Sequence, residues 1–255
     1  MLGLDVRTLD RVTTLTISRP EVRNALDRST SRELARAFRD FEADDSATVA
    51  VLAGSDGAFC AGADLKELAE GDLYEPWAWS LEGPTGRPCA KPVIAAVEGH
   101  ACAGGLGLAL WCDLRVAAQS AVFGVFSRRW GIPMSDGTTV RLPRVVGLGR
   151  ALDMLLTGRP VGADEALGMG LVSRVVPTGG ALGAAREMAQ QIASHPQAAL
   201  LCDRTSTYGQ AGLSLAEALR AEAGGSTEAR RRAASGAHRF ARGEGRHGAT
   251  PEEES

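Results

Sequence analysis

The chain has 255 residues, a formal net charge of -3 and 44% hydrophobic residues. A charge of this size and sign gives no support to a nucleic-acid partner or an anionic membrane. There is no run of about 18 apolar residues, so no membrane span is expected. The cysteines are odd in number and lack paired metal-ligand spacing, which predicts reduced thiols, no bound metal and a cytoplasmic location. They are Cys60, Cys89, Cys102, Cys112 and Cys202.

Apolar runs and helical patterns alternate through the first two thirds of the chain. Asp27 or Ser29 can cap an early helix, whose apolar face carries Leu34, Phe38 and Phe41. Several short runs are continuously apolar, as is typical of strands buried on both faces of a parallel sheet. Strand, turn and helix in alternation predict an α/β fold with crossover connections. The expected strands are residues 12–17, 48–53, 92–97, 114–117 and 172–176.

The last quarter of the chain shows helical patterns only, over residues 184–194 and 214–235. We therefore expect a core over residues 1–190 and a helical region over residues 191–242. Residues 243–255 contain too little apolar surface to pack, which predicts a mobile tail.

Two glycine-rich turns stand out, at residues 58–64 and 99–105. Each follows a strand-like run, and the second precedes a helical pattern at residues 106–111. Glycine and alanine allow a ligand to approach the main chain, so backbone N–H groups of two such turns can converge on one oxygen. This pairing predicts a site that stabilises an oxyanion.

These turns carry a resemblance to the crotonase, or enoyl-CoA hydratase/isomerase, superfamily. The resemblance implies an α/β ββα spiral core with a helical C-terminal region that builds homotrimers or dimers of trimers. It also implies an acyl group bound as its coenzyme A thioester, with no prosthetic group. The matching segments run in order along most of the chain: 19–20, 24–26, 58–66, 92–105, 112–115, 123–124, 131–133 and 158–159.

The resemblance places the oxyanion donors on the N–H groups of Ala63 and Gly104. The helix that begins near Gly105 would aim its positive end at the thioester oxygen as that oxygen becomes enolate-like.

The coenzyme A contacts carry over to the first turn. Ala61, Asp64 and Leu65 fall where family members line the adenine pocket. Lys66 falls where a cation meets a CoA phosphate, although a solvated lysine in the first turn of a helix is the alternative.

Family hydratases hold a water between two glutamates, and those two positions align with Gly107 and Ser127. Neither residue can transfer a proton as a carboxylate does, and each such group typically contributes about 10²–10⁴-fold. We therefore expect little hydration activity from a site of this composition.

Asp136 is the candidate to replace the missing carboxylates. It lies near the place where dienoyl-CoA isomerases and dehalogenases of the superfamily carry a catalytic aspartate. The alternative is a capping role for a helix that starts near Gly137, and one residue can do both.

Other polar residues of the second half are candidate substrate contacts. Ser127, Arg128 and Trp130 replace the usual acidic segment, and an arginine there can pair with Asp136 or with a carboxylate on the substrate. His100 is expected to be satisfied by the backbone rather than catalytic.

The sequence thus predicts an enzyme that stabilises a thioester enolate, with Asp136 as the candidate acid/base group. Isomerisation or another reaction assisted by Asp136 is better supported than water addition. The alternative is a catalytically degenerate acyl-CoA-binding or scaffold protein of the same fold.

Overall fold

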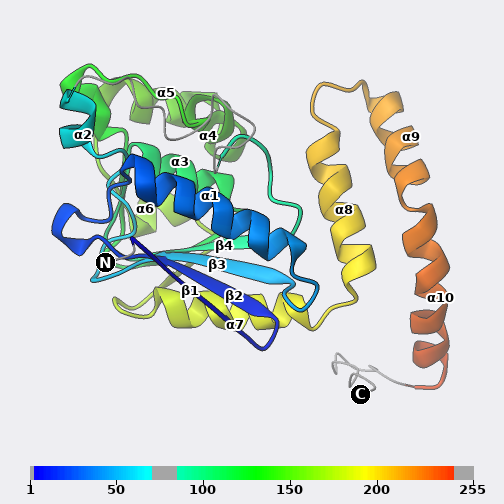
Figure 1. Cartoon of the computed structure of the whole chain (residues 1–255). Helices are drawn as coiled ribbons and strands as arrows, with labels where there is room; N and C mark the ends of the chain where they lie inside the picture. Colours follow the sequence, from blue (N-terminus) through cyan, green and yellow to red (C-terminus); the bar gives the residue numbers. More distant parts are fainter. Residues whose placement is uncertain (1–2, 71–84, 244–255) are drawn as a thin grey trace. The chain divides into compact units, whose positions relative to one another are not determined.

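A computed structural model describes residues 3–70 and 85–243 of the chain (Figure 1). It divides into two compact units, Met1–Gln190 and Gln191–Ser255. Of the tail predicted over residues 243–255, all but Gly243 lies outside the described residues.

The first unit is built on a six-stranded sheet. β1 and β2 are antiparallel, and every later pair in the sheet is parallel. β3 and β4 are almost wholly buried, which confirms the prediction made from their continuous apolar runs. In spatial order the strands are β1 (Leu4–Leu9), β2 (Val12–Ile17), β3 (Val49–Gly54), β4 (Val93–Val97), β6 (Leu114–Ala118) and β9 (Arg174–Val176).

β1 was not among the predicted strands. It lies at the edge of the sheet and most of its side chains are exposed, so it lacks the apolar pattern of a buried strand. A second, three-stranded sheet is formed by β5 (His100–Cys102), β7 (Val122–Gly124) and β8 (Val161–Gly162).

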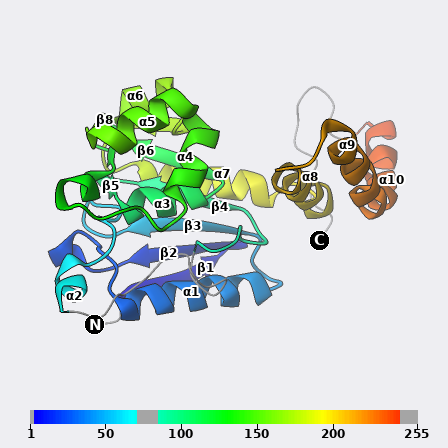
Figure 2. The same cartoon turned by 90° about the horizontal axis from the view of Figure 1, so that it is seen from above.

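Helices cover both faces of the main sheet. α1 and α3 lie on one face and α7 on the other (Figures 1 and 2). The Asp27 carboxylate accepts a hydrogen bond from the Thr30 N–H, which selects Asp27 over Ser29 as the cap of α1. The helices of this unit are α1 (Arg28–Ala43), α2 (Leu65–Ala69), α3 (Gly104–Trp111), α4 (Thr138–Val146), α5 (Leu148–Thr157), α6 (Ala163–Gly168) and α7 (Ala181–Ala193), with 3-10 turns η1 (Pro20–Val22) and η2 (Phe126–Trp130).

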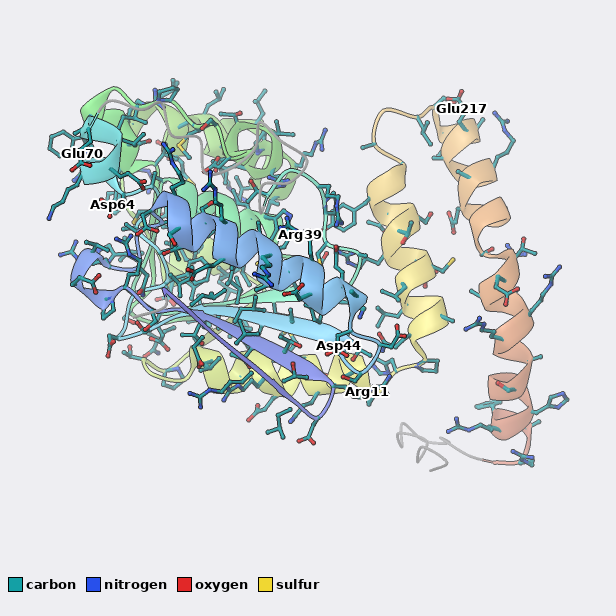
Figure 3. The ribbon with its side chains drawn as sticks, in the orientation of Figure 1. Arg11, Arg39, Asp44, Asp64, Glu70 and Glu217 are labelled. Atoms are coloured by element: carbon teal, nitrogen blue, oxygen red, sulfur yellow. The ribbon has the colours of Figure 1, made fainter. Side chains whose placement is uncertain are left out.

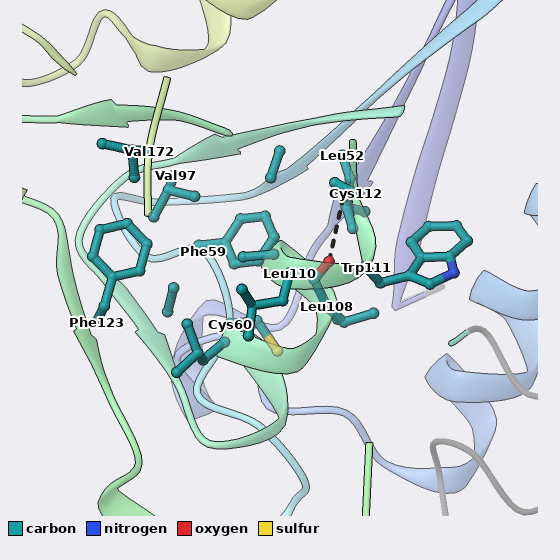
Figure 4. Packing of buried hydrophobic residues seen from close by; sticks show 14 of the residues in the cluster. Leu52, Phe59, Cys60, Val97, Leu108, Leu110, Trp111, Cys112, Phe123 and Val172 are labelled. Atoms are coloured by element: carbon teal, nitrogen blue, oxygen red, sulfur yellow. Dashed lines mark hydrogen bonds between the residues drawn. The ribbon is translucent and has the colours of Figure 1, made fainter. Parts of the chain in front are cut away.

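α3 is buried along its whole length and forms the centre of the hydrophobic core. Phe59 and Phe123 are among the buried side chains around it, and Leu108 is a buried side chain of the helix itself (Figure 4). The Cys112 thiol donates to the Leu108 carbonyl and closes the last turn of the helix. Because its surroundings are fixed by packing, the N-terminus of α3 has a fixed position in this unit.

The second unit contains α8 (Gln197–Gly209), α9 (Leu215–Gly225) and α10 (Thr227–Ala241). The prediction missed α8, in which no residue is buried, and merged α9 with α10 although Gly224 and Gly225 stand directly before the break at Ser226. A capping box between Ser214 and Glu217 starts α9 (Figure 3). None of the described helices is long and apolar enough to cross a bilayer.

Replacement of Phe38 tests the packing of α1 on α3. The Phe38 ring is buried and meets Trp111 edge-on, with centroids 4.7 Å apart. Phe38→Ala should lower the free energy of unfolding by about 3–5 kcal/mol, measured by denaturant titration. The exposed Arg36 of the same helix is the control, and Arg36→Ala should change that free energy by less than about 0.5 kcal/mol. Equal effects of the two substitutions would contradict this account of the core.

Candidate active site

The two glycine-rich turns are joined by main-chain hydrogen bonds. The Cys60 N–H donates to the His100 carbonyl at 2.9 Å, and the Cys102 N–H donates to the Cys60 carbonyl at 3.0 Å. A Cβ on Gly105 would lie 2.0 Å from the Cys60 oxygen, far inside van der Waals contact. Only glycine therefore allows the first turn to pack against the start of α3 at this distance.

The buried side chain of Asn24 holds the first turn through hydrogen bonds to its backbone. Its amide group donates to the carbonyls of Ser55 and Ala58, at 2.9 and 2.8 Å. Its side-chain oxygen accepts the Arg19 N–H at 2.8 Å. The residue is fully buried, so these bonds replace all the water contacts that the side chain loses on folding.

Two backbone N–H groups are left available where the turns meet. Neither the Ala63 nor the Gly104 amide donates a hydrogen bond within the described part of the chain. Gly104 is the first residue of α3, so its N–H belongs to the positive end of that helix. Ala103 before it has φ 48°, a conformation that costs of order 1–3 kcal/mol in a non-glycine residue and that persists where the surrounding structure enforces it.

A cavity of about 400 Å³ opens at this point. Ala63 and Gly104, the predicted oxyanion donors, line it together with apolar residues such as Leu68, Phe126 and Ile132. Of the lining residues in the described part of the chain, Asp136 alone carries a carboxylate.

The Asp136 side chain has two different environments. Oδ1 accepts the Thr138 N–H at 2.8 Å and so caps the start of α4, as one of the two sequence interpretations required. Oδ2 is buried and has no hydrogen-bond partner among the residues that the structure describes. Burial raises the pKa of this carboxyl above its ordinary value, opposed by the Thr138 hydrogen bond and by the positive charge of Arg141.

Arg141 fixes the turn that carries Asp136. One guanidinium nitrogen donates to the Asp136 carbonyl at 3.0 Å, and another donates to the Thr85 carbonyl at 2.7 Å. The side chain thus joins two segments that are 56 residues apart. Nothing in the sequence distinguished Arg141 from the other arginines.

The predicted substrate contacts separate into two groups. Ser127 is buried in the cavity wall with its Oγ 3.3 Å from the Met134 sulfur, and Trp130 lines the cavity although 70% of it is exposed. Arg128 is exposed and is not a lining residue, and Arg129 lies over the Phe126 ring at 4.8 Å. The positive charge beside Asp136 comes from Arg141 instead.

Comparison with known proteins identifies the family. The enoyl-CoA hydratase/isomerase family model matches residues 7–244. The chain belongs to the enoyl-CoA hydratase/isomerase family. It is 40% identical over 219 residues to a probable enoyl-CoA hydratase of Rhizobium meliloti, with 85% of each chain covered. It is 39% identical to the enoyl-CoA hydratase EchA19 of Mycobacterium tuberculosis over 71% of each chain.

Solved structures show the same fold over the whole chain. A crystal structure of an enoyl-CoA hydratase from Mycobacterium tuberculosis superposes with a TM-score of 0.90 at 34% identity and covers 99% of this chain and 98% of its own. An enoyl-CoA hydratase EchA1 from Mycobacterium marinum gives 0.90 at 33% identity over the same shares. The α/β crotonase fold with C-terminal helices, predicted from the two turns, is thereby confirmed.

The residues that the family resemblance assigned to coenzyme A are clustered around α2. Ala61 and Leu65 line the cavity, whereas Lys66 is exposed and is not a lining residue. The Asp64 carboxylate caps α2 by accepting the Lys66 N–H at 3.1 Å and pairs with Arg19 at 3.0 Å (Figure 3). Both oxygens of Asp64 thus have partners within the protein.

Two polar residues of the cavity were not predicted to be there. His100 lines it and makes no side-chain hydrogen bond in the described part of the chain, so the expected bond to the backbone is absent. Arg23 lines it in a left-handed conformation, φ 52°. A usable signal for Arg23 was its place directly before the motif residue Asn24.

The cysteines beside the turns behave as packing groups. Burial raises the pKa of both Cys60 and Cys102 to about 12. At neutral pH both thiols are therefore protonated and weakly nucleophilic, which agrees with the expected reduced thiols.

Substitution of Gly105 tests the close approach of the two turns. Gly105→Ala should lower the free energy of unfolding by about 1–3 kcal/mol because its methyl group would overlap the Cys60 carbonyl. The matched control is Gly183→Ala in α7, where a methyl group meets nothing within 4 Å. Thermal unfolding measures both, and a Gly105→Ala protein as stable as the control would contradict the packing described.

Asp136→Asn tests the cost of the buried carboxylate. A raised pKa means that the folded protein binds the proton more tightly than the unfolded chain, so stability is lost as pH rises through the folded pKa. The asparagine protein should therefore melt higher than wild type at pH 8, by about 2–4 °C for about 1 kcal/mol. Melting curves between pH 4 and pH 8 measure the difference, which should shrink toward pH 4. A difference that widens toward acid pH would show the opposite shift.

Proposed function

We propose that this protein is an acyl-CoA isomerase that shifts a carbon–carbon double bond along the acyl chain. In this proposal the thioester oxygen accepts hydrogen bonds from the N–H groups of Ala63 and Gly104. Asp136 moves a proton from one carbon of the acyl chain to another. The supporting observation is the buried, unpartnered Oδ2 of Asp136 in the same cavity as those two amides.

The proposed reaction needs one proton carrier and no other reagent. Asp136 in its ionised form removes a proton from C2 of a 3-enoyl thioester, and the electron pair moves into the conjugated enolate. The two N–H groups stabilise the negative oxygen of that enolate. The protonated Asp136 then returns its proton to C4, which leaves the 2-enoyl thioester and the starting carboxylate.

The raised pKa of Asp136 suits both halves of this cycle. A carboxylate that is buried away from water is a stronger base than an exposed one and holds the proton until it is returned. Its cap bond uses Oδ1 and leaves Oδ2 as the oxygen that carries the proton in this proposal.

Coenzyme A binding is proposed at Ala61, Asp64, Leu65 and Lys66. Ala61 and Leu65 would contact the adenine from the cavity wall, and the exposed Lys66 would meet a phosphate. Coenzyme A would enter as part of the substrate, with no prosthetic group required. Asp64 would contribute through the start of α2 that it caps rather than through a free oxygen.

A homotrimer or dimer of trimers is proposed for the assembly. Large apolar side chains of the second unit are exposed in the single chain, at Leu215, Leu219 and Phe240. Burial of such side chains between subunits is favourable. Sedimentation of the purified protein gives the mass directly.

Water addition is the competing activity because relatives at about 40% identity are named enoyl-CoA hydratases. The family resemblance aligns their two water-holding glutamates with Gly107 and Ser127 here. A protein that binds acyl-CoA without converting it is the other alternative. Turnover separates the three possibilities.

The test measures conversion of a 3-enoyl-CoA to the conjugated 2-enoyl-CoA by its ultraviolet absorbance. Hydration of crotonyl-CoA is assayed in parallel. Wild type should isomerise, and Asp136→Asn should lower kcat by about 10²–10⁴-fold with little change in KM. Asp40→Asn, at an exposed carboxylate of α1, is the control and should retain wild-type rates.

Three outcomes would overturn the proposal. Full isomerisation by Asp136→Asn would leave Asp136 as a cap only. Efficient hydration without isomerisation would favour the hydratase. Binding of 3-enoyl-, dienoyl- and 2-enoyl-CoA with no conversion of any would favour the binding protein.

A further inference from the structure

Gly107 and Asp136 share one volume of space. Gly107 lies within α3, three residues after Gly104, the proposed oxyanion donor at the first position of the helix. A Cβ placed on Gly107 would lie 2.3 Å from Oδ2, 2.4 Å from Cγ and 3.0 Å from Cβ of Asp136. The Asp136 carboxylate therefore fills the place that any side chain at position 107 would begin to occupy.

This contact is particular to Gly107. Gly149 in α5 and Gly183 in α7 are also helical glycines, and a Cβ on either would meet nothing within 4 Å. A glycine inside a helix carries an entropic cost relative to alanine, so at position 107 that cost accompanies a specific neighbour. That neighbour is also the one carboxylate among the described residues of the cavity wall.

Two hydrogen bonds hold Asp136 on the side that faces away from Gly107. Oδ1 is held by the Thr138 N–H at 2.8 Å, and the Asp136 carbonyl is held by Arg141 at 3.0 Å. The whole residue is 1% exposed. Because close-packed interiors move by small amounts only, a new methyl group at 107 has to displace the carboxylate rather than slide past it.

We propose that Gly107 is the positioning residue for the proton carrier: its missing side chain seats the Asp136 carboxylate against α3. A side chain at 107 overlaps the carboxylate of Asp136 in its present position, so one of the two groups has to move. The carboxylate of the site thus comes from the turn before α4, in space that α3 would otherwise fill. This inference rests on the proposed function, in which Asp136 carries the proton.

The first experiment is a double-variant cycle in thermal unfolding, which needs no turnover. Gly107→Ala should lower the melting temperature although the same substitution at Gly149 leaves it unchanged or raises it. In an Asp136→Ala background the carboxylate is gone and only the Cβ contact at 3.0 Å is left, so Gly107→Ala should lower the melting temperature by much less than it does in wild type. Non-additivity of the two substitutions measures the contact between the two residues.

The second experiment follows isomerisation of the 3-enoyl-CoA and its pH profile. Gly107→Ala should lower kcat by at least about tenfold with a smaller change in KM, because the carrier is displaced while binding groups remain. The acid limb of its kcat profile should also move, since a displaced carboxylate has a different burial. A merely structural loss would leave that limb where it is in wild type.

A relocation variant completes the test. Gly107→Glu combined with Asp136→Ala puts a carboxylate back into the same space from α3, and should isomerise faster than Asp136→Ala alone. Gly107→Glu alone should not isomerise faster than Asp136→Ala, because the introduced glutamate and the Asp136 side chain then compete for the same space.

The results that overturn the inference differ from those that overturn the function. Additive melting shifts, or an unchanged pH profile in Gly107→Ala, would show that Gly107 does not position Asp136. Full turnover by Asp136→Asn would instead remove the proton-transfer role itself, whatever the melting cycle shows.

Discussion

The site depends on the distance between two turns of main chain, and the Cys60 carbonyl against Gly105 sets that distance. The same pair of turns is close again at Gly99, where a Cβ would lie 2.2 Å from the Gly57 carbonyl, and at Gly62, where it would lie 3.0 Å from the Gly104 nitrogen. Main-chain hydrogen bonds through Cys60 fix the register of the two turns, in the same way that such bonds fix the register of neighbouring parallel strands. Two donors on separate turns therefore reach one place without a hydrogen-bonding side chain, and main-chain donors cannot rotate away from it as side chains can.

The order of strands, turns and helices around the site could be predicted from sequence because each of these elements has its own local pattern of residues. Strand, glycine-rich turn and helix follow one another at residues 92–111, and each has a short-range signal. Asp136 was selected as a candidate by elimination. Its contact with Gly107 joins residues far apart in the chain, and the spacing of residues in the sequence does not reveal such a contact. Arg141 acts through the backbone carbonyl of Thr85, 56 residues away, so nothing in its neighbours along the chain marks it. The second unit was predicted less well, since α8 has no buried face to give it a period.

The site also holds two features of the first unit that are energetically unfavourable. Ala103 has a backbone conformation that glycine would adopt more easily, and Asp136 keeps a buried oxygen without a partner. Each feature costs stability and is surrounded by a well-packed core that can offset it. In the proposed reaction both features lie next to the substrate: Ala103 precedes the Gly104 amide that meets the thioester oxygen, and Oδ2 of Asp136 carries the proton.

The shared space of Gly107 and Asp136 also limits how such a site can change over generations. A lineage that moves its carboxylate from the turn before α4 to α3 needs two substitutions, and neither order is smooth. Enlarging residue 107 first crowds the existing carboxylate, and shrinking residue 136 first removes it. With Asp136 as the proton carrier, as proposed, either intermediate is impaired, so the two placements of the acid group are separated by a step that lowers activity. Gene duplication, which keeps one working copy, is the natural way across.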